Sequence, residues 1–446
     1  MDHLSTLRIL SEAADWDAVA PSPRIESCGQ TLIGESAVND EPGVATPAQT
    51  PQVSEDAAYG ICRVKRLGGG SVPILKVLLS NVCSYNCAYC VNRRSANVRR
   101  ASFQPEELAR TVADFDARGV IHGAFISSGV LGSPDDTMER LIWTAQTLRE
   151  RYVYKGYLHL KVIPGASPEL VRLAMRYATR VSVNIELPSE ESLLRIAPDK
   201  SPDAILTPMT TIADQLCELA ETNPQRTSSG SFSSMSAGQT TQLIVGASPE
   251  SDAVILGLAQ HLYTRFNVRR VYYSAFRPEG AAPSLPHLAA PPYRREFRLY
   301  QADMLFRWYG FSPQELFASG EFLDEDLDPK TSWALRNIEF FPVELMTADF
   351  GQLLRVPGIG PASAQKILAL RKAGRLNSSS LKKLRIRLKY ALWFITLHGR
   401  SQATEIQGPW ETPAHCTLDH PEILREFLKE KKPVPPPINP ELDFLS

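Results

Sequence analysis

The sequence predicts an α/β protein in which six strands form a partial (βα)6 barrel of the TIM type, followed by a C-terminal all-α domain. Short runs rich in β-branched residues alternate with helical patterns between residues 74 and 274, as expected of parallel βα units. Six strands are fewer than the eight that close a TIM barrel, so the sheet should stay partly open. Near residue 358, a glycine-containing turn between two helical stretches indicates the all-α part.

Length and composition describe a soluble protein of more than one domain. At 446 residues the chain is longer than a domain with a single hydrophobic core usually is, which predicts two domains plus tails. No apolar run approaches the length of a membrane span, and the first residues lack the basic and apolar regions of a signal peptide. The seven cysteines, three of them clustered, do not form a disulfide framework and fit a reducing compartment. We therefore expect a cytoplasmic protein without membrane contact.

Charge is unevenly distributed along a nearly neutral chain. The net charge is −1, yet residues 59–105 contain eight Lys or Arg and no acid, and residues 351–404 contain eleven and no acid. Two such blocks favour a polyanionic partner. A solvated basic face without a partner is the alternative.

The composition shifts predict five segments. These are an N-terminal helix and flexible segment at 1–58, the barrel at 59–278, a linker with barrel-closing helices at 279–345, the all-α domain at 346–400, and a tail at 401–446. The first segment begins with a short amphipathic helix at about His3–Ala14 and is then rich in Pro, Ser, Thr and Gly.

Individual elements of the barrel have their own local signals. Ser133-Pro134 and Ser167-Pro168 each place an N-cap residue before a proline at the first helical position, and apolar stripes follow both. Short β-rich runs separate such helices. The six strands are predicted at Ile74–Leu79, Gly123–Ser127, Tyr157–Val162, Arg180–Glu186, Thr241–Gly246 and Arg270–Ser274.

Three cysteines follow the first predicted strand directly. Cys83, Cys87 and Cys90 have C-x3-C-x2-C spacing, and three thiolates in eight residues can bind one face of a cubane cluster. A [4Fe–4S] cluster needs four ligands, so three cysteines leave one iron open to a small molecule. A zinc site or buried thiols are the alternatives, but zinc prefers four nitrogen or sulfur ligands in paired spacing, and no second pair follows closely.

With Tyr89 just before the last cysteine, this stretch resembles the radical S-adenosylmethionine (SAM) signature. The resemblance implies that the open iron binds the amino and carboxylate groups of SAM, and that reduction splits SAM into methionine and a 5′-deoxyadenosyl radical. It also implies an electron donor such as flavodoxin or ferredoxin. Proteins of this superfamily are built on six-stranded partial barrels with the cluster loop after the first strand, in agreement with the predicted pattern.

The carboxyl ends of the other strands are expected to contact SAM, because ligands bind at that edge of parallel sheets. Ser127, Ser128 and Gly129 end the second strand, where the superfamily often carries a Gly-Gly-Glu-like motif, but this chain has no carboxylate there. Asn184 and Glu186 share one face of the fourth strand and are candidates for binding the ribose. Alternatively, Glu186 caps the helix that begins near Ser189.

Two further candidates carry weaker signals. Gly246 lets the backbone approach the adenine edge, and Tyr272 is placed to stack on adenine or on a substrate base, unless it packs in the core. The polar stretch 227–242 is either a lid over the site or a solvated loop. Cys28, Cys62, Cys217 and Cys416 are either structural or act as extra ligands or hydrogen donors.

The second motif is Val356-Pro-Gly-Ile-Gly360, between two short helical stretches. It resembles the helix-hairpin-helix of DNA-repair and recombination proteins. Gly358 and Gly360 permit a turn that exposes backbone N–H groups at a helix N-terminus, where a phosphate can bind. Ile359 should anchor the turn in the core, with Lys366, Arg371 and Lys372 as nearby cations. Residues 381–395 resemble a degenerate second copy, and a protein-docking module is the alternative.

Together, these motifs resemble the radical SAM proteins assigned to DNA modification or repair, over about residues 59–400. The resemblance implies a class of reaction rather than a substrate: a radical delivered to a nucleotide in DNA. It makes a uracil-DNA-glycosylase-like protein a candidate partner. A tRNA-modifying radical SAM enzyme and a non-catalytic iron–sulfur DNA-binding protein are the alternatives.

Overall fold

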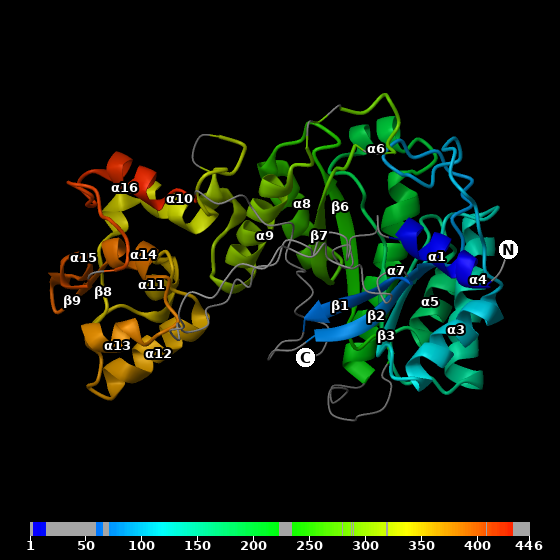
Figure 1. Cartoon of the computed structure of the whole chain (residues 1–446), viewed down its shortest axis with the longest axis horizontal. Coiled ribbons are helices and arrows are strands. Elements are labelled where there is room, and N and C mark those ends of the chain that lie inside the picture. Colours follow the sequence, from blue (N-terminus) through cyan, green and yellow to red (C-terminus); the bar gives the residue numbers. More distant parts are fainter. Residues whose placement is uncertain are drawn as a thin grey trace, which may run out of the picture. The chain divides into compact units, whose positions relative to one another are not determined.

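A computed structural model describes residues 3–14, 59–65, 71–222, 234–278, 280–286, 288, 290–317, 320–406 and 408–430. The chain divides into two compact units (Figure 1). The first contains the described residues up to Ser248 and those from Leu262 to Pro291, and the second contains Pro249–His261 and the described residues from Pro292 to Glu430. Among the described residues, no helix is long and apolar enough to cross a membrane. Cys28 and residues 227–233 of the predicted lid lie outside the described residues, and the rest of that stretch forms a turn and the start of a strand at Gln239.

The first unit is built on a curled, seven-stranded half-barrel in which the strands lie side by side in chain order. Strands β2 to β7 are parallel and correspond to the six predicted strands. Their bounds are β2 (Ser71–Leu78), β3 (Gly123–Ser127), β4 (Tyr157–Lys161), β5 (Arg180–Ser182), β6 (Gln239–Val245) and β7 (Val268–Ala275). The partial barrel of parallel strands that the sequence predicts is confirmed.

The predicted count of six strands is wrong, because a seventh strand joins the edge of the sheet. Strand β1 (Ile61–Lys65) pairs antiparallel with β2, so that Cys62 lies opposite Ile74. Val64, Ile74 and Phe125 form a small core with the Cys62 side chain. A single five-residue strand after a polar segment has little periodicity, and its pairing partner decides its conformation.

Helices cover the outer face of the sheet (Figure 1). Ser133 accepts a hydrogen bond from the Asp136 N–H at the start of α4, as predicted from the Ser-Pro pair. The prediction for the N-terminal helix is also confirmed, since α1 spans His3–Ala14 with Leu7 and Leu10 fully buried. The helices that follow in this unit are α3 (Pro105–Ala117), α4 (Pro134–Gln146), the short π-helix η2 (Thr147–Arg151), α5 (Pro168–Tyr177), α6 (Glu190–Ile196) and α7 (Pro202–Thr222). Most of α8 (Asp252–Arg265) belongs to the second unit.

The second unit is mainly helical. The prediction that its C-terminal part is all-α is wrong. A small sheet of three short strands, in the order β10-β9-β8, interrupts the helices. Helix α9 belongs to this unit, so its predicted role in closing the barrel stays a prediction. The elements are α9 (Tyr293–Trp308), η3 (Pro313–Leu316), α10 (Pro329–Arg336), η4 (Ile338–Phe340), β8 (Val343–Glu344), α11 (Phe350–Arg355), α12 (Pro361–Lys372), α13 (Ser378–Lys382), α14 (Leu388–Ala391), η5 (Leu392–Phe394), β9 (Ile395–Leu397), β10 (Arg400–Ser401), α15 (Gln402–Glu405) and α16 (Pro421–Leu428).

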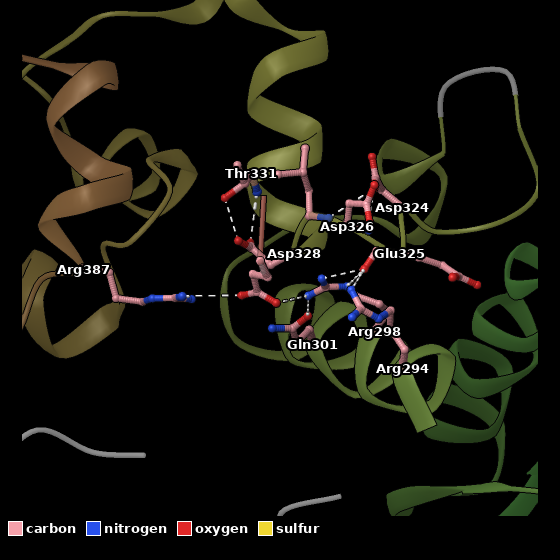
Figure 2. A network of polar contacts seen from close by, with 11 residues as sticks. Arg294, Arg298, Gln301, Asp324, Glu325, Asp326, Asp328, Thr331 and Arg387 are labelled. Atoms are coloured by element: carbon pink, nitrogen blue, oxygen red, sulfur yellow. Dashed lines mark hydrogen bonds and ion pairs between the residues drawn. The ribbon is translucent and has the colours of Figure 1, made fainter. Parts of the chain in front are cut away.

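A buried arginine organises the interior of the second unit (Figure 2). The Arg298 side chain is 1% exposed, and its guanidinium donates to the carbonyl of Glu325 and to the Gln301 amide oxygen. The same guanidinium lies 3.0 Å from the carboxylate of Glu430, which also pairs with Arg387. A buried guanidinium is tolerated only when its donors are satisfied, and these contacts tie α9 to the end of α16 and to the segment before α14.

Candidate active site

A pocket in the first unit lies at the carboxyl ends of the parallel strands. The loop after β2 brings the three cysteines to one side, and the ends of β3, β4, β5, β6 and β7 form the others. Most of the predicted site residues meet here: Cys83, Cys87, Tyr89, Cys90, Ser127, Ser128, Gly129, Asn184 and Glu186. Residues that are far apart in the sequence therefore line one pocket.

The cysteine thiols have the surroundings expected of metal ligands. Backbone N–H groups of Tyr85 and Val130 each lie 3.4 Å from the Cys83 sulfur, and that of Asn92 lies 3.3 Å from the Cys90 sulfur. Such N–H donors favour a thiolate. Burial, together with the neighbouring Cys87, raises the pKa of the Cys90 thiol to about 12. A thiol of this kind loses its proton when it binds a metal cation.

The cluster loop is held by many backbone contacts. The Arg100 guanidinium donates to four carbonyls within it, those of Asn81, Asn92, Arg93 and Ala96. Lys76, in the same acid-free block, is only 3% exposed. Part of the positive charge at residues 59–105 therefore lies inside the first unit and is not available to a polyanion.

A second set of contacts fixes the loop to the segment after α6. The Ala88 N–H donates to the carbonyl of Ile196 over 2.8 Å, and the Asn86 N–H donates to the Asp199 carboxylate over 2.6 Å. Lys200 continues this segment and lines the pocket. Hydrogen bonds therefore fix the cysteine loop to the segment at 196–200.

Lys200 forms a buried ion pair with Glu186. Its ammonium lies 2.7 Å from Glu186 Oε1 and donates to the Tyr89 hydroxyl over 3.1 Å. The Lys200 and Glu186 side chains are 9% and 7% exposed. Burial alone would lower the pKa of Lys200, but the Glu186 carboxylate and Cys87 raise it overall, so the lysine stays charged.

The helix-cap alternative for Glu186 does not apply. Helix α6 is capped by Ser189, whose hydroxyl accepts from the Ser192 N–H. Glu186 instead lies beyond the end of β5, in the left-handed conformation with φ of +67°. Its side chain lines the pocket beside Asn184, whose amide donates to Gln242.

Two predicted cofactor contacts do not line the pocket. Gly246 follows β6 in a turn with φ of +91°, and Ile244 takes the place on the wall. Tyr272 is 3% exposed and bonds to Arg180 one layer deeper in the barrel, which matches the core-packing alternative. Ser274, two residues further along β7, reaches the pocket instead.

Several lining residues have no motif in the sequence. Lys161, Gln242 and Ser274 lie on strands, and the alternation of side chains along a strand could have identified them. Lys200 lies in the irregular segment between α6 and α7, where the sequence has no periodic pattern that could predict its direction. Cys62, Cys217 and Cys416 do not line the pocket, and Cys62 bonds to the Ile74 carbonyl as a buried core residue.

The comparison with known proteins agrees with this geometry. Residues 77–216 match the radical SAM superfamily. The chain carries a radical SAM domain. Two solved structures are similar to part of the chain. One is HydG, a maturase of the [FeFe]-hydrogenase, with 17% identity over 51% of this chain and 48% of that one, at a TM-score of 0.37. The other is the FeFe-hydrogenase maturase HydG from Carboxydothermus hydrogenoformans, with 14% identity over 51% and 49%, at 0.38.

The chain thus covers about half the length of either maturase. No curated protein matches the chain. Proteins of the radical SAM superfamily use a [4Fe–4S] cluster and SAM, which confirms the cofactors predicted from the cysteine triad.

The residues present fit this cofactor pair. Cys83, Cys87 and Cys90 are free thiols around one pocket, and they would hold three irons of the cluster. In the described part of the chain, no three His, Cys, Asp or Glu side chains converge on a single metal ion. Three thiols that each bind a different iron need no such convergence. When bound, the cluster and SAM supply a reductively generated radical.

The predicted hairpin lies in the second unit and has a helix on either side. Asp349 caps α11 and Gly360 caps α12, with Gly358 between them at φ of +80°. Ile359 and Val356 are at most 1% exposed, so their side chains anchor the turn and only their backbone can face a ligand. The Lys330 ammonium, itself 6% exposed, donates to the Ile359 carbonyl over 2.5 Å.

The predicted cations near the hairpin separate into two kinds. Lys366 and Lys372 are exposed on α12. Arg371 instead donates to the carbonyls of Leu345 and Ala348, so it holds the segment before α11. A second turn, at residues 383–387 between α13 and α14, occupies the place of the predicted degenerate copy.

Proposed function

We propose that this protein is a radical SAM enzyme that generates a 5′-deoxyadenosyl radical to repair or modify a nucleotide in DNA. The observation that supports the radical chemistry is the pocket, which is lined by three cysteine thiols and by polar strand-end residues. The sulfurs of Cys83 and Cys90 also accept hydrogen bonds from backbone N–H groups. The nucleic-acid part of the proposal rests on the second unit alone.

In the first unit, each wall of the pocket has its own task. The cysteine loop holds the cluster, and Tyr89 lies between two of its ligands. Glu186 and Asn184 are placed to accept and donate hydrogen bonds to the ribose of SAM. Ser127, Ser128 and Gly129 line the side next to Cys83, where the amino group of SAM would need acceptors.

In the second unit, the turn and its surroundings favour a phosphate backbone. The first N–H groups of α12 lack partners one turn back, as at any helix start, and follow a glycine that leaves them accessible. The helices around and after the turn carry exposed cations, and no acid occurs from residue 351 to 404. These are Lys366, Lys372, Lys382, Lys383, Arg385 and Arg387. Phosphate contacts position a protein on DNA without reading its sequence.

A base within a duplex is out of reach of a pocket. The target nucleotide must therefore flip out of the duplex or be presented in a single strand. The electron for the cluster would come from a donor such as flavodoxin or ferredoxin. A uracil-DNA-glycosylase-like protein is a candidate partner, and we place the reaction in the cytoplasm.

Binding by the full chain tests the choice of nucleic acid. Fluorescence anisotropy should show that labelled duplex DNA is displaced by unlabelled duplex more readily than by tRNA. Changing Lys366 and Lys372 to Ala should weaken binding at every sequence and flatten the slope of log affinity against log salt, by up to about 0.9 for each phosphate that is no longer neutralised. Preferential displacement by tRNA would favour an RNA-modifying enzyme.

Anaerobic SAM cleavage separates an enzyme from a non-catalytic iron–sulfur protein. The reconstituted, reduced chain should release methionine and 5′-deoxyadenosine. A chain that binds DNA and holds iron but cleaves no SAM would be a DNA-binding protein with a structural cluster.

A further inference from the structure

We propose that Lys200 is a positioning residue that couples the cofactor contact at Glu186 to the cluster loop. The inference rests on the radical SAM chemistry proposed above and is independent of the nucleic acid. It assigns a role to a buried charge for which the sequence carries no motif. Three sets of contacts support it.

The first is the backbone at Glu186. A non-glycine residue with φ of +67° is strained, and it persists only where its surroundings fix it. Here the Glu186 N–H donates to the Gln242 carbonyl over 3.0 Å, and its carbonyl accepts from the Ile244 N–H over 2.8 Å. The backbone is thus clamped to β6, and the direction of the carboxylate depends on what holds its oxygens.

The second is the ion pair itself. Lys200 Nζ holds Glu186 Oε1 at 2.7 Å, whereas Oε2 makes no hydrogen bond to any described residue. One oxygen is therefore committed and the other is left for a ligand in the pocket. Without the ammonium, the side chain would be a buried carboxylate free to rotate or to take up a proton.

The third is the link from Lys200 to the cysteines. Its ammonium donates to the Tyr89 hydroxyl over 3.1 Å, and Tyr89 directly precedes Cys90. The adjacent Asp199 and Ile196 hold the N–H groups of Asn86 and Ala88 in the same loop. The segment at 196–200 thus contacts the loop at three points, and its last residue holds Glu186.

Charge adds a second consequence. The described pocket wall contains one carboxylate, Glu186, and Lys200 faces both this group and the loop that carries the thiolates. A fixed positive charge beside the cluster stabilises its reduced, more negative state. Removing that charge should make the cluster harder to reduce and should release Glu186 at the same time.

The test compares Lys200→Met and Lys200→Arg with wild type after anaerobic reconstitution. Lys155→Met, at an exposed lysine of the first unit away from the pocket, is the matched control. Iron content, the dissociation constant for SAM and the reduction potential of the cluster are measured on each. Lys200→Met should keep its iron, bind SAM on the order of tenfold or more weakly, and show a more negative potential. Lys200→Arg should recover most of both changes, and Lys155→Met should match wild type.

Wild-type SAM affinity and potential in Lys200→Met would overturn the proposal. If Lys200→Met loses its iron, Lys200→Gln decides, because its amide can still donate hydrogen bonds but carries no charge. Weaker SAM binding and a lower potential in Lys200→Gln support the coupling, and wild-type values contradict it. A wild-type protein that binds no SAM would instead defeat the proposed function, so the two failures are distinguishable.

Discussion

The backbone N–H of Arg387 donates to the carbonyl of Gly358 over 3.1 Å, which joins the second turn of the C-terminal unit to the glycine of the first. The Ser363 hydroxyl adds a bond to the Arg385 carbonyl. The two turns therefore pack backbone against backbone. A side chain at Gly358 would disturb this contact before it disturbed a bound phosphate.

Substitutions at the two hairpin glycines should consequently differ. A Cβ at Gly358 would lie 2.6 Å from the Arg387 carbonyl oxygen and would require φ of +80°, so Gly358→Ala should destabilise the second unit by more than about 1 kcal/mol. Gly360 has an ordinary φ of −103°, and its Cβ would approach only the Tyr309 hydroxyl, at 3.1 Å. Gly360→Ala should therefore cost less. Thermal denaturation of both variants checks the order, and equal midpoints would contradict it.

Two adjacent cations on α12 should give opposite phenotypes. Arg371→Ala removes the donor to the Leu345 and Ala348 carbonyls, which should lower the free energy of unfolding by about 1–3 kcal/mol. Lys372 is exposed, so Lys372→Ala should leave stability unchanged and weaken DNA binding. Denaturant titration and anisotropy on the two variants separate the roles. If Arg371→Ala binds DNA more weakly at unchanged stability, Arg371 contacts DNA and the structural role is wrong.

Lys330 should make the stability of the second unit depend on pH. Burial lowers its pKa to about 7; the nearby Asp328 opposes this shift and Arg355 adds to it. Between about pH 7 and 10.5 the unfolded chain then holds a proton that the folded chain lacks, so the free energy of unfolding should rise with pH. The destabilisation by the buried charge is complete below pH 7.

The matched variant is Lys330→Met, which fills the same space without a titrating group. Its free energy of unfolding should rise less steeply from pH 7 to 10 than that of wild type, by up to about 1.4 kcal/mol per pH unit. Urea denaturation at several pH values measures both slopes. Parallel slopes would show that Lys330 is not neutralised in the folded unit.

Gly129 offers a test of the residues at the end of β3, Ser127 to Gly129, which are predicted to line the cofactor site. A Cβ there would overlap the Val82 carbonyl oxygen and lie 3.2 Å from the Cβ of Cys83. Gly129→Ala should therefore displace the start of the cluster loop and lower the iron bound per chain. Ser128→Ala, at the neighbouring wall position, should retain its iron. Iron analysis after anaerobic reconstitution gives the answer, and full loading of Gly129→Ala would show that the loop adjusts and still binds the cluster.

The sequence allowed prediction of those parts of the fold and site that repeat or that form a motif. Parallel strands and their proline-started helices have periodic patterns, and the cysteine triad has fixed spacing. Asn184 and Glu186 both line the pocket, but they follow the end of β5 at Ser182, so the strand alternation used to predict them does not describe their conformation. Alternation along β7 does not indicate how deep in the barrel a side chain lies, and Tyr272 is buried against Arg180 below the pocket.

Contacts between irregular segments could not be predicted in this way. Lys200 contacts Glu186 because a helix and its flanking loops fold back toward the pocket. No pattern in the residues between them predicts this ion pair. The charge pattern predicts that Arg100 and Arg371 contribute to binding a polyanion, yet both donate to backbone carbonyls. A basic residue that satisfies carbonyls within the fold looks the same in sequence as one that binds a phosphate.

The most direct test of the account is transfer of hydrogen from DNA to the product of SAM cleavage. The reconstituted and reduced protein is incubated anaerobically with SAM and with oligonucleotides, damaged and undamaged, whose nucleosides carry deuterium. Mass spectrometry then measures deuterium in the released 5′-deoxyadenosine. The account predicts label from at least one DNA substrate, none from deuterated tRNA, and no product from the Cys83→Ala variant. Label that comes from tRNA alone, or unlabelled product that forms equally with and without DNA, would contradict it.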